Sequence, residues 1–166
     1  ESYFADILAN KDKEQYQAFV AFANKHKLWY NPGGILDPVN IANQYCYMEM
    51  YPETIEYYNR GLNELDVTGY RGTGVEPGVY ISNIPRVIKA YEEEGRDSEI
   101  MTFLIQSREA LGDAFRLRMN YQIAKYALEN ETALDEGNKA LAYCKANYKE
   151  NRYFSIENIN ALEERM

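Results

Sequence analysis

Residues 41–66 read IANQYCYMEMYPETIEYYNRGLNELD, and this stretch is the most informative part of the chain. Its small and aromatic residues recur with helical spacing, and Pro52 divides it near the middle. Proline is well tolerated in the first turn of a helix, and Asp37 stands where an N-cap would precede another such proline. We therefore expect an antiparallel hairpin of two helices, over about 38–50 and 52–65.

The spacing within this hairpin predicts how its helices pack. Ala42 precedes Tyr45 by three positions, Thr54 precedes Tyr58 by four, and Gly61 falls one turn later. Small side chains let helices approach closely, while a ring one turn away fills the space beside them. Glycine inside a helix costs about 1 kcal/mol relative to alanine, so we interpret Gly61 as a contact point rather than a surface glycine of no consequence. On this view Gly61→Leu overpacks the contact, whereas Gly61→Ala is neutral or mildly stabilising.

This pattern resembles the tetratricopeptide repeat, which places a small residue and an aromatic one at these intervals in a unit of about 34 residues. A looser copy spans 84–111, with Ile88 and Ile100 where the pattern has small residues. A third candidate over 113–147 has Gly137 at the aromatic position. The resemblance implies an all-α fold of stacked antiparallel hairpins that form a superhelix. The alternative is an irregular α-helical bundle.

The rest of the chain is also helical in pattern, with no convincing strand. Val79 to Ile81 is the one short strand-like run. We expect N-caps at Asp113 and Ser155, and a capping box formed by Thr132 with Asp135. The total is eight or nine helices and no sheet, in one domain over 1–166. Besides the hairpin, the expected helices cover residues 3–9, 12–27, 84–94, 98–111, 113–129, 132–147 and a short segment from 155.

Composition limits the possible partners. The 166 residues, 46% of them hydrophobic, suit one folded domain, and the formal charge of -8 disfavours nucleic acid. The longest apolar run, Ala18–Ala23, is far too short to span a membrane, so we expect a soluble protein. Because the chain begins at Glu1, its location stays open between the cytoplasm and export after removal of a leader.

The resemblance also implies a binding surface along the inner face of each first helix. Its carboxylate-clamp form has a lysine four residues before Asn43, where this chain has Val39. Residues 37–66 contain one arginine and six acidic residues, so we expect an acidic surface that favours a basic protein or peptide. The implied surface residues are Asn43, Cys46 and Tyr47 in the clear copy and Lys89, Glu92 and Glu93 in the looser one.

A glycine-rich loop over 67–79 contains the sequence VTGYRGTGVEPG. It lacks the Gly-Lys-Ser/Thr ending of a phosphate-binding loop. We interpret it as a connector, or as a recognition or active-site loop centred on Tyr70 and Arg71.

Residues for catalysis and metal binding are few. His26 is the single histidine, and Cys46 and Cys144 form no CxxC motif, so we expect buried thiols, no metal site, no cofactor and no enzymatic activity. The 16 tyrosines either form an aromatic core or cover a binding surface. Neighbours such as Tyr57 and Tyr58 should not both be fully buried on one helix.

Three functional hypotheses follow. The first is a non-enzymatic, protein- or peptide-binding helical repeat module with an acidic, tyrosine-rich surface. The second is an acidic inhibitor or immunity-type protein that blocks a basic site on a nuclease or DNA-binding protein. The third is an unrecognised enzyme that uses the 67–79 loop.

Overall fold

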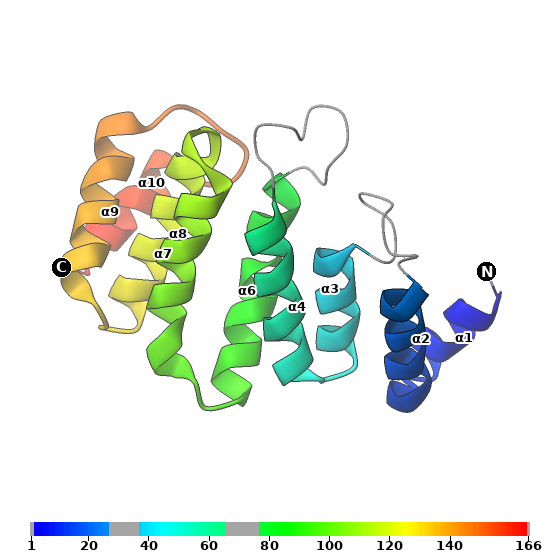
Figure 1. Ribbon diagram of the computed structural model, residues 1–166. Helices are drawn as coiled ribbons and strands as arrows, with labels where there is room; N and C mark the ends of the chain where they lie inside the picture. Colours follow the sequence, from blue (N-terminus) through cyan, green and yellow to red (C-terminus); the bar gives the residue numbers. More distant parts are fainter. Residues whose placement is uncertain (1, 27–36, 66–76, 166) are drawn as a thin grey trace. The chain divides into compact units, whose positions relative to one another are not determined.

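The computed structural model describes residues 2–26, 37–65 and 77–165, and within these ranges it contains nine α-helices and no strand (Figure 1). The prediction of an all-α fold is confirmed. The chain divides into two compact units, Glu1–Asp97 and Ser98–Met166. The single domain expected from the sequence stays a prediction. None of the helices in the described ranges has the length and apolar character needed to cross a membrane.

The first unit contains five of the helices. The prediction of a capped hairpin is confirmed, because Pro38 starts α3 and the Asp37 carboxylate accepts the Val39 N–H at 3.1 Å. Only short stretches separate α1 from α2 and α3 from α4. The helices are α1 (Ser2–Ala9), α2 (Lys13–His26), α3 (Pro38–Tyr47), α4 (Tyr51–Glu64) and α6 (Pro77–Glu93).

Helix α6 begins at Pro77, earlier than the sequence predicted. Residues 77–79 of the expected loop are therefore helical, and the strand-like run from Val79 to Ile81 is helix as well. The misleading residue is Pro85, which reads as a first-turn proline but lies inside the helix. Apolar side chains on both sides of this proline are buried, and this packing holds the helix together across the interruption.

Gly61 lies where α3, α4 and α6 meet. A Cβ atom added to it would lie 2.6 Å from Tyr80 Oη on α6 and 2.9 Å from Pro38 Cβ on α3. Ala42, the other small residue of the pattern, is also buried. The prediction that Gly61 is a packing contact is confirmed. The geometry argues against the expectation that alanine is tolerated there, because even one methyl group meets two neighbours.

Rings pack against both sides of α4. Tyr58 is buried against α6, where its hydroxyl donates to the Tyr80 carbonyl at 2.8 Å. Tyr57 packs on Tyr45 of α3 at 5.4 Å between ring centroids, and Tyr45 in turn contacts Tyr16 of α2 at 5.0 Å. Tyr58 is 0% exposed and Tyr57 9%, so both neighbours are buried on one helix, Tyr57 slightly less completely. The reason is that α4 has a neighbour on either side.

The second unit also pairs its helices through small residues. A Cβ atom on Gly137 of α9 would lie 2.6 Å from Ala127 Cβ of α8, so the glycine lets these two helices approach closely. A 3-10 turn at Asp97–Glu99 spans the boundary between the two units along the chain. The second unit then contains α7 (Ile100–Leu111), a 3-10 turn at Asp113–Phe115, α8 (Arg116–Glu129), α9 (Leu134–Asn147) and α10 (Ile156–Glu163).

Two of the N-cap predictions for this unit are wrong. Asp113 starts a 3-10 turn, and its carboxylate accepts from Arg116 Nε instead of capping α8. Ala133 is the N-cap of α9 in the left-handed conformation, with φ of 45°, so Thr132 forms no capping box there. The Ser155 cap is confirmed, and with Asn158 it makes a capping box that begins α10.

Candidate functional site

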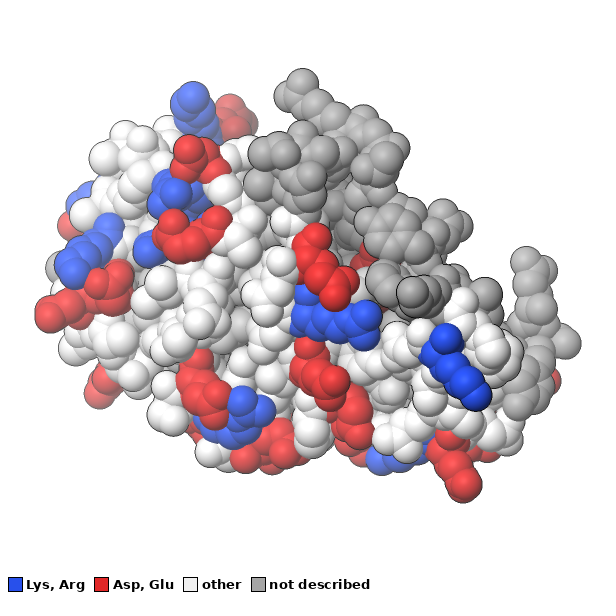
Figure 2. Space-filling model, viewed as in Figure 1, with Lys and Arg blue, Asp and Glu red and all other residues white. Residues whose placement is uncertain are grey.

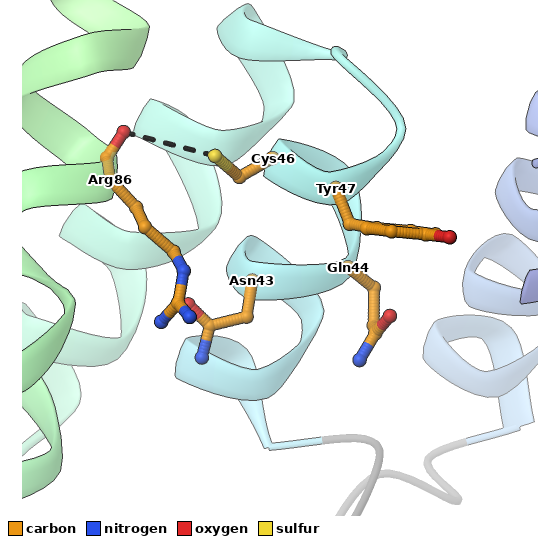
Figure 3. A pocket seen from close by; sticks show the side chains of 5 residues that line it. All are labelled: Asn43, Gln44, Cys46, Tyr47 and Arg86. Atoms are coloured by element: carbon orange, nitrogen blue, oxygen red, sulfur yellow. Dashed lines mark hydrogen bonds between the residues drawn. The ribbon is translucent and has the colours of Figure 1, made fainter.

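An open pocket of about 410 Å³ lies on the first unit, between α3 and α6. Four of its lining residues lie on α3 and one on α6 (Figure 3). They are Asn43, Gln44, Cys46, Tyr47 and Arg86.

The pocket faces outward because the other side of α3 belongs to the core. Ile41, Ala42 and Tyr45 are buried among the neighbouring helices. The residues one and two positions after Ala42 and after Tyr45 point away from the core, since a helix turns once every 3.6 residues. The lining residues on α3 are half-buried or exposed as a result.

One side of the pocket is polar and cationic. Figure 3 shows the Arg86 guanidinium turned toward the Asn43 amide. Arg86 Nη1 also donates to Asn83 Oδ1 on its own helix. The Cys46 thiol approaches the Arg86 carbonyl oxygen at 3.9 Å, a contact that joins α3 to α6 (Figure 3).

The electrostatics at Cys46 place a second cation nearby. Partial burial raises the pKa of the Cys46 thiol, and the positive charges of Lys89 and Arg86 oppose that rise. Lys89 Nζ lies 5.9 Å from the centroid of the Tyr51 ring. Two cations therefore lie on the α6 side of the pocket.

The other side of the pocket is aromatic. Tyr47 is 52% exposed, which is unusual among the tyrosines of the described ranges. Figure 3 shows Tyr47 and Gln44 turned away from Arg86, toward α2. Lys11, in the turn between α1 and α2, places its Nζ atom 4.7 Å from the centroid of the Tyr47 ring.

The structure brings together only some of the residues expected at the site. Asn43, Cys46 and Tyr47 line one pocket, and Lys89 lies beside it. Glu92 and Glu93 are exposed near the end of α6 and do not line it. The remaining two, Tyr70 and Arg71, lie outside the described residues.

Sequence reasoning missed Gln44 and Arg86. Arg86 stands one helical turn before Lys89, so the two share a face of α6, and this spacing is a usable signal. Both residues lie within the helix expected over 84–94, but nothing in the sequence shows that this face of the helix lies beside Asn43. Gln44 carries no signal beyond its position next to Asn43.

The charge of the pocket differs from the expected acidic surface. Its lining contains one arginine and no carboxylate. Acidic side chains outnumber basic ones over α4, where Arg60 pairs with Glu64 at 3.1 Å (Figure 2). The net charge of the chain thus gives a poor description of this pocket.

Neither cysteine forms a disulfide with the other. Cys144 is buried, and burial raises its pKa to about 12, whereas Cys46 is only half-buried. The expectation of two buried thiols therefore holds for Cys144 alone. Among the described residues, no group of three or more His, Cys, Asp or Glu side chains is arranged to hold a metal ion.

Comparisons with protein-family models, with curated proteins and with solved structures find no match. The fold defines the class as an all-α protein with packed helical pairs, such as α3 with α4 and α8 with α9. The looser repeat copy straddles the two units, since α6 belongs to the first and α7 to the second. The tetratricopeptide resemblance therefore remains a prediction.

Proposed function

We propose that the chain is a non-enzymatic binding module that holds a peptide or an extended protein segment at the pocket between α3 and α6. The observation that carries this proposal is the position of Asn43, Cys46 and Tyr47. The repeat resemblance assigned them to a binding surface, and they line one pocket of about 410 Å³. That volume is within the usual range of ligand sites.

The side chains of the pocket suit peptide recognition. The Asn43 and Gln44 amides each offer donors and an acceptor, and no described residue hydrogen-bonds to either side chain. Tyr47 adds a large, rigid surface at small entropic cost, as is common where proteins bind one another. Two amides beside an exposed ring can hold both the backbone and a side chain of a bound segment.

Peptides selected by display against the full chain, measured by calorimetry, test the proposal. Tyr47→Ala should weaken binding by about tenfold or more, the effect of losing a buried aromatic contact. Tyr153→Ala is the matched control, because Tyr153 is 47% exposed but lies on the second unit. Equal affinities for both variants, or failure to select any peptide, would contradict the proposal.

The two alternatives have less support. An inhibitor of a basic protein needs a concentrated acidic surface, and on acidic α4 Arg60 pairs with Glu64 and offsets part of the charge. An enzyme using the 67–79 loop depends largely on residues 67–76, which lie outside the described ranges. We therefore place the binding module first.

A further inference from the structure

We infer that the pocket takes the carboxylate of an aspartate or glutamate side chain within an extended, acidic segment of its partner. This inference rests on the proposed function and makes it specific. The inferred partner segment is acidic, whereas the net charge of -8 favours a basic partner.

The first observation is that the pocket cations have no acidic partner. Among the described residues, Arg60, Arg108 and Arg116 each form an ion pair with a glutamate or aspartate. Arg86 and Lys89 form none with any described carboxylate, although the chain has an excess of acidic residues. The Arg86 bond to Asn83 leaves other N–H groups of its guanidinium available, since arginine has five donors.

The second observation is convergence. Arg86 and Asn43 come from different helices, and their side chains turn toward one another (Figure 3). A guanidinium beside a primary amide supplies several N–H donors, and a carboxylate has two acceptor oxygens to receive them. The lining contains no carboxylate that would repel such a guest.

The long-range charge of the chain does not override this local arrangement. At physiological salt the Debye length is about 8 Å, so exposed acidic residues farther away are largely screened. The electrostatic energy of a carboxylate in contact with Arg86 is therefore set mainly by the nearby cations.

The geometry favours a side-chain carboxylate over a chain terminus. The carboxylate-clamp form of the tetratricopeptide repeat has a lysine at the position of Val39, which is buried here and has no side-chain donor, so this chain lacks that contact to a terminal carboxylate. In Figure 3, Gln44 and Tyr47 turn to the opposite side from Arg86 and Asn43. A segment crossing α3 would place its acid at Arg86 and a neighbouring residue at Tyr47.

The test uses the full chain and an array of peptides with acetylated N-termini and amidated C-termini. Each peptide is printed in three versions that differ at one central residue, Glu, Gln or Lys. A fourth version has the Gln centre and a free C-terminal carboxylate. The measurements are repeated with Arg86→Gln and with Arg165→Gln, a matched arginine substitution on the second unit.

We expect the Glu versions to bind about tenfold more tightly than the Gln versions, as befits a hydrogen bond between charged groups. Arg86→Gln should abolish that preference, and Arg165→Gln should keep it. Preference for Lys, equal binding of Glu and Gln, or binding that requires the free C-terminus would each overturn the inference while leaving peptide binding itself intact. Absence of binding by every version would overturn the proposed function as well.

Discussion

Gly61 on α4 faces Tyr80 on α6 so closely that a Cβ atom in its place would lie 2.6 Å from the tyrosine hydroxyl. The same Cβ atom would lie 2.9 Å from Pro38 on α3. One missing side chain thus sets the spacing of three helices. Because α3 and α6 also form the pocket, this contact links the core of the first unit to the proposed binding surface.

Replacing Gly61 with alanine should destabilise the protein by about 1–3 kcal/mol, the usual cost of overpacking. The Tyr80 ring cannot yield easily, because it packs against the Tyr58 ring at 5.4 Å between centroids. Urea unfolding of Gly61→Ala measures the loss. Adding Tyr80→Phe removes the nearer clashing atom, so a double-mutant cycle should show partial recovery. Strict additivity of the two changes would contradict this account of the contact.

A parallel prediction concerns α8 and α9. Gly137→Ala should cost a similar amount, about 1–3 kcal/mol, because its Cβ atom would lie 2.6 Å from Ala127 Cβ. Ala127→Gly in the same chain should restore part of the stability by removing the opposing methyl group. Unfolding followed by circular dichroism gives the comparison. Wild-type stability of Gly137→Ala would show that the helices can separate at no cost.

The two thiols should react at different rates. Thiolate is the reactive form, and burial both raises the pKa of Cys144 to about 12 and blocks access to it. Cys46 is half-buried on the wall of an open pocket. Iodoacetamide followed by mass spectrometry should therefore modify Cys46 first, and Cys144 only on unfolding. Faster labelling of Cys144 in the native protein would contradict its placement.

Stability should fall at alkaline pH. Burial raises the pKa of Tyr58, and also those of Tyr16, Tyr45 and Tyr80, above the ordinary value of 10.0. Below about pH 10 these phenols are neutral in both the folded and unfolded states, so their contribution to stability is complete. As the pH rises above about 10, the unfolded phenols ionise first and stability is lost. Urea midpoints should decline above that pH, and a constant midpoint would argue against buried hydroxyls.

Much of the helix layout could be predicted because its signals are local. Asp37 and Pro38 mark the start of α3 by cap chemistry that involves adjacent residues, and Ser155 does the same for α10. The start of α6 was missed because a proline inside a helix is rare and Pro85 looked like a beginning. The helix continues through Pro85 because apolar residues on both sides of this proline are buried. That burial depends on the tertiary fold and not on the local sequence.

The candidate site was predicted on its α3 side and, on its α6 side, only at Lys89. The tetratricopeptide resemblance implies Asn43, Cys46 and Tyr47, and these three residues line the pocket. Arg86 depends on the register of α6 against α3, which no local pattern specifies. The charge of the pocket escaped prediction for the same reason, because it comes from a residue 40 positions away from Cys46 in the chain.

The central claim is that the surface shared by α3 and α6 binds an extended segment. Hydrogen–deuterium exchange of the full chain, with and without a display-selected peptide, tests it most directly. The account predicts slower exchange along Pro38–Tyr47 and Pro77–Glu93 when the peptide is bound. Protection confined to residues 98–166, or no protection anywhere despite binding, would contradict it.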